Sequence, residues 1–148
     1  MPQPEELIEE LMYRMSTVSG VEYTARNPNK PPEVSNLPCI QVFELTDSVE
    51  EASCRGAGAY PSYRRKLNVI IEMFLKASAP GPASQELRAF VVEMKKKLYE
   101  GGITLGGTCS GIKELESGRV LRPPIGENAI GIGIALVIEY VETIGDLF

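Results

Sequence analysis

Two long segments, residues 64–76 and residues 128–142, alternate between apolar and other side chains, and this alternation constrains the fold more than any other feature. In the first segment the odd-numbered residues from Leu67 onward are Leu, Val, Ile, Met and Leu. In the second segment the even-numbered residues from Ile130 onward are Ile, Ile, Ile, Leu, Ile and Tyr. Successive side chains of a β-strand point to opposite faces, so this period predicts two long strands, each with one strongly apolar face.

Two other segments repeat their apolar side chains with the period of a helix. Residues 4–15 place Leu, Ile and Met on one stripe and four glutamates opposite it. Residues 84–100 form a similar stripe from Leu, Phe, Val and Met, and Ser84 suits the N-cap of that helix. We therefore expect two amphipathic helices, the second of them ended by Gly101.

Shorter apolar segments predict further strands at residues 21–26, 39–45 and 111–115. The resulting order is helix, strands, helix, strands, which indicates an α+β fold with a mostly antiparallel β-sheet packed by two α-helices. A length of 148 residues suits a single domain, so we assign residues 1–148 to one domain.

Three connecting segments have no periodic pattern. Residues 27–38 contain four prolines, which exclude a regular helix or a central strand there. Residues 46–63 are rich in small residues and glycines, and glycines also punctuate residues 101–111. Long irregular connections in a compact domain are often functional, and we expect mobile loops near 46–63 and 101–111.

The composition excludes several kinds of catalysis. The sequence has no histidine, so it lacks the usual general base, the Ser-His and Cys-His pairs and the commonest metal ligand. Its three cysteines show no CxxC spacing, so we expect reduced, cytosolic thiols and neither a zinc site nor a disulfide framework. The longest apolar stretch, residues 129–138, is about half of the ~20 residues that a membrane helix needs. We expect no catalytic residue, cofactor, metal or membrane contact.

Two glycine-containing motifs have a catalytic or cofactor-binding alternative. Residues 107–111, GTCSG, fit a nucleophile elbow around Cys109, but that elbow needs a following helix and a histidine, so we interpret it as a glycine-rich turn. Gly131 and Gly133 begin a dinucleotide fingerprint, but Leu136 takes the place of its third glycine. We expect these glycines to let another element approach closely.

Carboxylate pairs are the remaining catalytic alternative. Glu114 with Glu116, or Glu139 with Glu142, are able in principle to exchange protons without histidine. We interpret both pairs as solvated strand ends.

The net charge of −5 argues against a general nucleic-acid binder, and its distribution is uneven. Residues 1–60 contain 4 basic and 10 acidic side chains, residues 61–100 contain 8 and 4, and residues 101–148 contain 3 and 6. This pattern indicates either opposed surfaces that pair with copies of the same chain or merely solvated helices of unlike composition. Tyr and Arg are enriched at interfaces, and lysines in a last helical turn also complement the helix dipole. The candidate interface residues are Arg55, Tyr60, Tyr63, Arg64, Arg65, Lys95 and Lys96.

The order of elements over nearly the whole chain resembles that of the tail terminator proteins of long-tailed phages, also called minor tail protein U or tail completion proteins. The resemblance lies in an N-terminal helix, the strand NLPCIQVFEL, an irregular loop, the strand YRRKLNVIIEMFLKA, the helix ELRAFVVEMKKKLYE and the ending GENAIGIGIALVIEYVE.

The resemblance implies a non-enzymatic subunit that forms a hexameric ring on the head-proximal end of the tail tube, ends tube polymerisation and joins the head. Its implied partners are further copies of itself, the tail tube protein and the head-tail connector, with DNA only passing through the ring lumen. It implies a place in the virion tail, and in the host cytoplasm during assembly. The alternatives are another head-tail joining (neck) protein, a small cellular α+β binding or regulatory domain and, last, a carboxylate- or thiol-dependent enzyme.

Unlike charges on different sides of one subunit favour head-to-tail contacts, which close into a ring when the rotation allows. We therefore expect the acidic N-terminal half and the basic residues 64–97 to contribute to opposite sides of a subunit contact.

Overall fold

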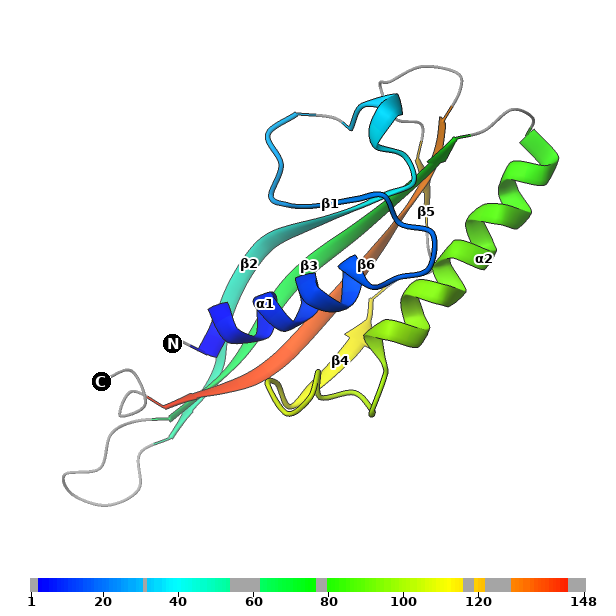
Figure 1. Ribbon diagram of the computed structural model, residues 1–148. Helices are drawn as coiled ribbons and strands as arrows, with labels where there is room; N and C mark the ends of the chain where they lie inside the picture. The colour runs from blue at the N-terminus through cyan, green and yellow to red at the C-terminus, as the bar shows by residue number, and fades with distance from the viewer. Residues whose placement is uncertain are drawn as a thin grey trace.

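A computed structural model of the chain describes residues 3–30, 32–53, 62–76, 80–115, 119–121 and 129–143. Within these residues two helices lie against one side of a six-stranded sheet (Figure 1). The elements are α1 (Gln3–Ser16), β1 (Tyr23–Arg26), the short 3-10 helix η1 (Val34–Asn36), β2 (Cys39–Ser53), β3 (Ser62–Lys76), α2 (Pro80–Leu98), β4 (Gly111–Glu114), β5 (Arg119–Leu121) and β6 (Ala129–Thr143).

The sheet has the order β1-β2-β3-β6-β4, and β5 also pairs with β6. Strands β2, β3 and β6 are the long ones, and β3 pairs with β6 along its entire length, from Ser62 opposite Thr143 to Lys76 opposite Ala129. All pairings are antiparallel except that of β1 with β2, which is parallel. The predicted α+β class, with two helices on a mostly antiparallel sheet in a single domain, is confirmed.

The predicted apolar faces form the core. Along β3 and β6 the alternating residues Val69, Ile71, Ile134 and Leu136 are buried and face the helices. The apolar stripe of α1 is buried against the same face, with Leu7, Ile8, Leu11 and Met15 fully inaccessible to solvent. Burial of apolar area at about 25 cal/mol per Å² makes this shared core the main stabilising contribution.

Arg14 of α1 ends the α2 helix by binding its last carbonyl groups. Its Nη1 donates to the carbonyl oxygens of Lys97, Leu98 and Glu100 at 3.1, 3.1 and 2.8 Å. Its Nε donates to Glu10 Oε1 at 2.9 Å, so the buried guanidinium is also paired with a carboxylate. The positive charge complements the negative end of the α2 dipole and fixes the two helices relative to one another.

The largest difference from the sequence prediction concerns residues 46–53, which continue strand β2 instead of starting an irregular loop. Two register shifts, between Glu44 and Asp47 and between Val49 and Glu51, interrupt the pairing with β3. Each shift breaks the period of two, because an extra residue in one strand moves the following side chains to the other face. Residues 54–61, the rest of the predicted loop, lie outside the described part of the chain.

Smaller differences concern α2 and residues 101–121. The α2 helix begins at Pro80, so Ser84 lies inside it and is not its N-cap. The segment 101–111 is a series of hydrogen-bonded turns in which Leu105 and Cys109 are buried, and its mobility stays a prediction. Strand β5 has no counterpart in the sequence prediction, because a three-residue strand is too short to show a period.

Candidate interaction surface

The sheet ends in two edges of different character. One edge consists of β1 and the outer side of β2, and the other consists of β4 beside β6. Figure 1 shows that the long strands β2, β3 and β6 extend past the start of α1, while α2 lies near β4. We call these surfaces the β2 edge (residues 43–53) and the β4 edge (residues 111–115).

The β2 edge is open because β1 is short. Among the described residues, β1 pairs with β2 only along 39–42, and the backbone N–H of Glu44 donates to the side chain of Asn27 at 2.8 Å. Beyond that point Leu45 and Val49 are 56% and 49% exposed. An edge that exposes apolar side chains next to unpaired backbone groups is a surface suited to contact with another chain.

The β4 edge presents apolar side chains beside lysines. Leu115, directly after β4, is 56% exposed. Lys95 in the last turn of α2 binds Glu114 of β4 at 2.7 Å, which ties the helix to this edge. Lys113 pairs with Glu139 at 3.6 Å and remains largely exposed.

A polar cluster supports the extended end of the sheet on the side that carries the helices. The buried Tyr140 donates its hydroxyl hydrogen to Asp47 Oδ2 at 2.6 Å, and Arg65 Nε donates to Asp47 Oδ1 at 3.0 Å. Glu142 lies 3.7 Å from the same guanidinium. Burial, followed by the hydrogen bond to Asp47, raises the pKa of Tyr140, and the hydrogen bond to Asp47 raises the pKa of Arg65. The cluster is internally satisfied, so it stiffens the strands at the point where β2 is bulged.

The structure separates the candidate interface residues of β3. Tyr63 and Arg65 lie on one face of this strand and Arg64 on the other, because their positions alternate. Moreover, β3 is a central strand between β2 and β6, so these residues lie away from both sheet edges. Arg55 and Tyr60 lie outside the described residues.

The two lysines among the candidate residues are both in ion pairs within the subunit. Lys95 binds Glu114 at 2.7 Å, and Lys96 binds Glu93 one turn earlier at 3.0 Å. They lie in the last turn of α2, near the β4 edge. Of the basic stretch 64–97, only this last part is next to a sheet edge.

The alternative catalytic groups have ordinary structural surroundings. Burial raises the pKa of the Cys39 and Cys109 thiols to about 11, so both are protonated at neutral pH. Glu139 and Glu142 pair with different cations, Lys113 and Arg65. The partner proposed for Glu114, Glu116, lies outside the described residues.

The described ranges contain no candidate metal site and no candidate membrane-spanning helix. No group of three or more Cys, Asp or Glu side chains there is placed to hold a metal ion. Neither described helix is long and apolar enough to cross a membrane.

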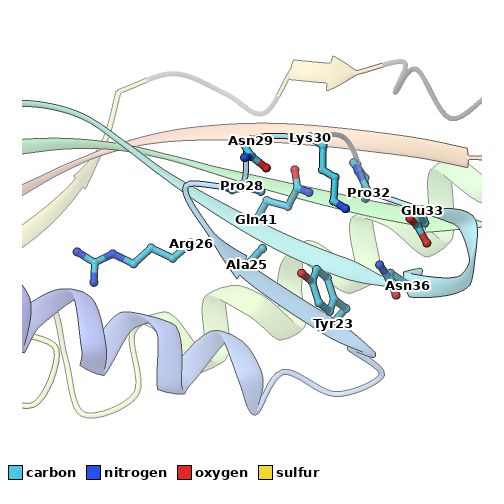
Figure 2. Close-up of a pocket in the computed structure, with 10 residues that line it drawn as sticks. All are labelled: Tyr23, Ala25, Arg26, Pro28, Asn29, Lys30, Pro32, Glu33, Asn36 and Gln41. Carbon is cyan, nitrogen blue, oxygen red and sulfur yellow. The ribbon is translucent and has the colours of Figure 1, made fainter.

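A cavity of about 380 Å³ lies beside β1, under the proline-rich segment that connects β1 to β2 (Figure 2). The sequence prediction treats this segment only as a loop, and the cavity was not expected. It arises from a tertiary contact, because the loop returns over the start of β2. A short strand followed by four prolines is the local signal for such a rigid returning loop. The residues that line the cavity are Tyr23, Ala25, Arg26, Pro28, Asn29, Lys30, Pro32, Glu33, Asn36 and Gln41.

Comparison with known proteins adds little to this geometry. No family model and no curated protein matches the sequence. One solved structure, whose name describes no function, is similar over 92% of this chain and 96% of its own, with 11% identity and a TM-score of 0.41. A likeness this weak carries no argument, so the function has to be argued from the surfaces of the chain itself.

Proposed function

We propose that this chain is a structural subunit of the tail terminator kind, which assembles head to tail into a hexameric ring and has no enzymatic activity. The ring caps the head-proximal end of a phage or prophage tail tube, ends its polymerisation and provides the joining surface for the head-tail connector. DNA only passes through the lumen of the ring as cargo. The subunit acts in the host cytoplasm during assembly and in the virion tail afterwards.

The observation that carries the proposal is the presence of two unlike open edges on opposite sides of one sheet. A contact between two different surfaces of the same chain is heterologous, and such contacts close into rings when the rotation between copies permits. The β2 edge offers Leu45 and Val49, and the β4 edge offers Leu115, so each side has an apolar centre. Apolar centres surrounded by charged groups are typical of subunit interfaces.

Charge complementarity supports the same contact. Strand β2 contains four acidic residues and no basic one, whereas three lysines occupy the last turn of α2 near the β4 edge. Most of these groups are paired within the subunit: Lys95 with Glu114, Lys96 with Glu93, Glu44 with Arg26 and Asp47 with Arg65. Charge therefore orients approaching copies only weakly, beside the contact of the apolar side chains. We propose the same division into an acidic and a basic side, with the end of α2, and not β3, beside the β4 edge.

The bulges of β2 favour a selective contact over random strand pairing. Bulges twist an edge strand away from the flat geometry that other strands need for uncontrolled pairing. The acidic side chains of β2 further discourage two β2 edges from meeting, because like charges repel. A partner edge has to match both the twist and the charge, and the β4 edge of another copy matches the charge.

The element order supports the more specific assignment, since a helix, a long strand pair, a second helix and a long closing strand resemble the terminator pattern. Another neck protein would use the same type of contact. A small cellular binding domain is the second candidate function, and the cavity beside β1 is the observation that favours it.

Electron microscopy tests the proposal. Purified protein is mixed with polymerising tail tubes from the phage or prophage that encodes the chain, and tube ends are examined at increasing subunit concentration. We expect rings at one end of each tube and a shorter, uniform tube length. Tubes that continue to grow with bare ends at saturating protein would contradict the proposal. Rings in solution are not required, because a terminator is able to close its ring on the tube.

A further inference from the structure

The cavity beside β1 has the size of a ligand pocket. Its volume of about 380 Å³ falls within the range of about 300–1,000 Å³ in which proteins bind small molecules or single peptide residues. Pro28 and Pro32 restrict the loop that forms one wall, and β1 and β2 form the other. A site between a stiff loop and a sheet is largely preformed, which lowers the entropic cost of binding.

Gln41 provides a polar group at the base of the cavity. It is 3% exposed and belongs to strand β2. Its side chain makes no hydrogen bond to any residue in the described part of the chain. Figure 2 shows its amide directed toward the space between Lys30 and Asn29. No fully buried side-chain N or O atom among the described residues lacks a hydrogen-bond partner, so the polar atoms of the Gln41 amide are open to the cavity, where they are able to donate to and accept from a ligand.

The two cations of the cavity differ in their availability. Arg26 points away from the centre in Figure 2, and it binds Glu5 at 2.6 Å and Glu44 at 2.8 Å. Lys30 instead points into the cavity and has no ion pair with any described residue. The network around Arg26 is neutralised, so Lys30 supplies the positive charge that a ligand meets.

We propose that this cavity binds a carboxylate that is next to a peptide amide, with Lys30 bound to the carboxylate and the Gln41 side chain hydrogen-bonded to the amide. Lys is a compact triple donor suited to an anion, and the Gln amide both donates and accepts, as a peptide group requires. The prolines and the ring of Tyr23 supply apolar walls.

This chemistry has two sources in a partner polypeptide, a free C-terminus or an Asp or Glu side chain. The inference does not depend on ring assembly, because the cavity lies in one subunit. Its failure therefore leaves the proposed function intact, and the reverse also holds.

NMR titration of the isotope-labelled full chain tests the inference. The probes are acetyl-Ala-Ala with a free C-terminus, acetyl-Ala-Glu-Ala-amide, and the neutral acetyl-Ala-Gln-Ala-amide. We expect one acidic peptide to shift the Gln41 Nε2 signals saturably, with about tenfold weaker binding of the neutral peptide. The acidic peptide that binds more tightly identifies the source of the carboxylate.

Two variants keep the test specific. Lys30→Gln changes an exposed residue, and we expect it to weaken binding of the acidic peptide to the level of the neutral one. Arg88→Gln, an exposed change in α2, is the matched control and leaves binding unchanged. Equal binding of acidic and neutral peptides, no saturable shift with either acidic peptide, or unchanged binding by Lys30→Gln would each overturn the proposal.

Discussion

The contact between Gly131 and Phe74 shows how one residue type permits a specific strand pairing. These residues lie opposite one another in the β3–β6 ladder. A Cβ atom at Gly131 would overlap the Phe74 ring and would also lie 3.1 Å from the Met73 carbonyl oxygen. Phe74 packs in turn against buried Leu37 and Cys39, so a shift of its ring would disturb these contacts. The predicted role of this glycine, close approach of another element, is confirmed.

Replacing Gly131 with alanine therefore destabilises the chain. The added methyl group forces the Phe74 ring or the backbone to move, and overpacking of this kind costs about 1–3 kcal/mol. Urea unfolding followed by circular dichroism measures the change as a lower midpoint. Gly111→Ala is the matched control, since its Cβ meets only the flexible end of Ile103 at 3.4 Å. Equal urea midpoints for the two variants would show that the overlap with Phe74 does not destabilise the chain.

At the level of elements, the sequence predicts the helices and strands whose apolar side chains repeat with a regular period. It does not predict features that depend on bulges or on contacts between distant segments. The alternation in β3 and β6 and the stripes of α1 and α2 indicate both the elements and their buried faces. The end of β2 escapes prediction because its bulges interrupt the period. The cavity escapes prediction for a different reason: Lys30 and Gln41 belong to separate segments, and only the returning loop brings them together. The hydrogen bond between Tyr140 and Asp47 also joins residues that are distant in the sequence, so the sequence pattern does not predict it.

The connection between α1 and α2 depends on Arg14, and we expect Arg14→Lys to weaken it. Lysine keeps the charge but loses the planar fork that reaches both Glu10 and the three carbonyl groups at the end of α2. Loss of hydrogen bonds to a charged group costs about 1.5–3 kcal/mol. Thermal unfolding should show a lower midpoint, together with faster amide hydrogen exchange in the last turn of α2. Arg88→Lys, a change of an exposed residue in α2, is the control. An unchanged midpoint for Arg14→Lys would show that the carbonyl groups find other donors.

At the scale of the whole molecule, the helices cover one face of the sheet and leave two unlike edges accessible (Figure 1). Strand β2 contains four acidic residues, and three lysines lie in the last turn of α2 near β4. In the proposed head-to-tail contact, one edge of each copy meets the other edge of the next copy. In the proposed ring this asymmetry would give two different faces, as a cap between a tube and a connector requires.

Site-directed cross-linking on capped tubes tests this head-to-tail contact most directly. Two variants, Leu45→Cys and Leu115→Cys, are made in a background with Cys54 replaced by serine, and they are mixed and treated with a short bis-maleimide. The remaining cysteines, Cys39 and Cys109, are buried. We predict covalent dimers that join position 45 of one copy to position 115 of the next, only when both variants are present. Dimers that form equally well with either variant alone would contradict the account, because they require identical edges to meet.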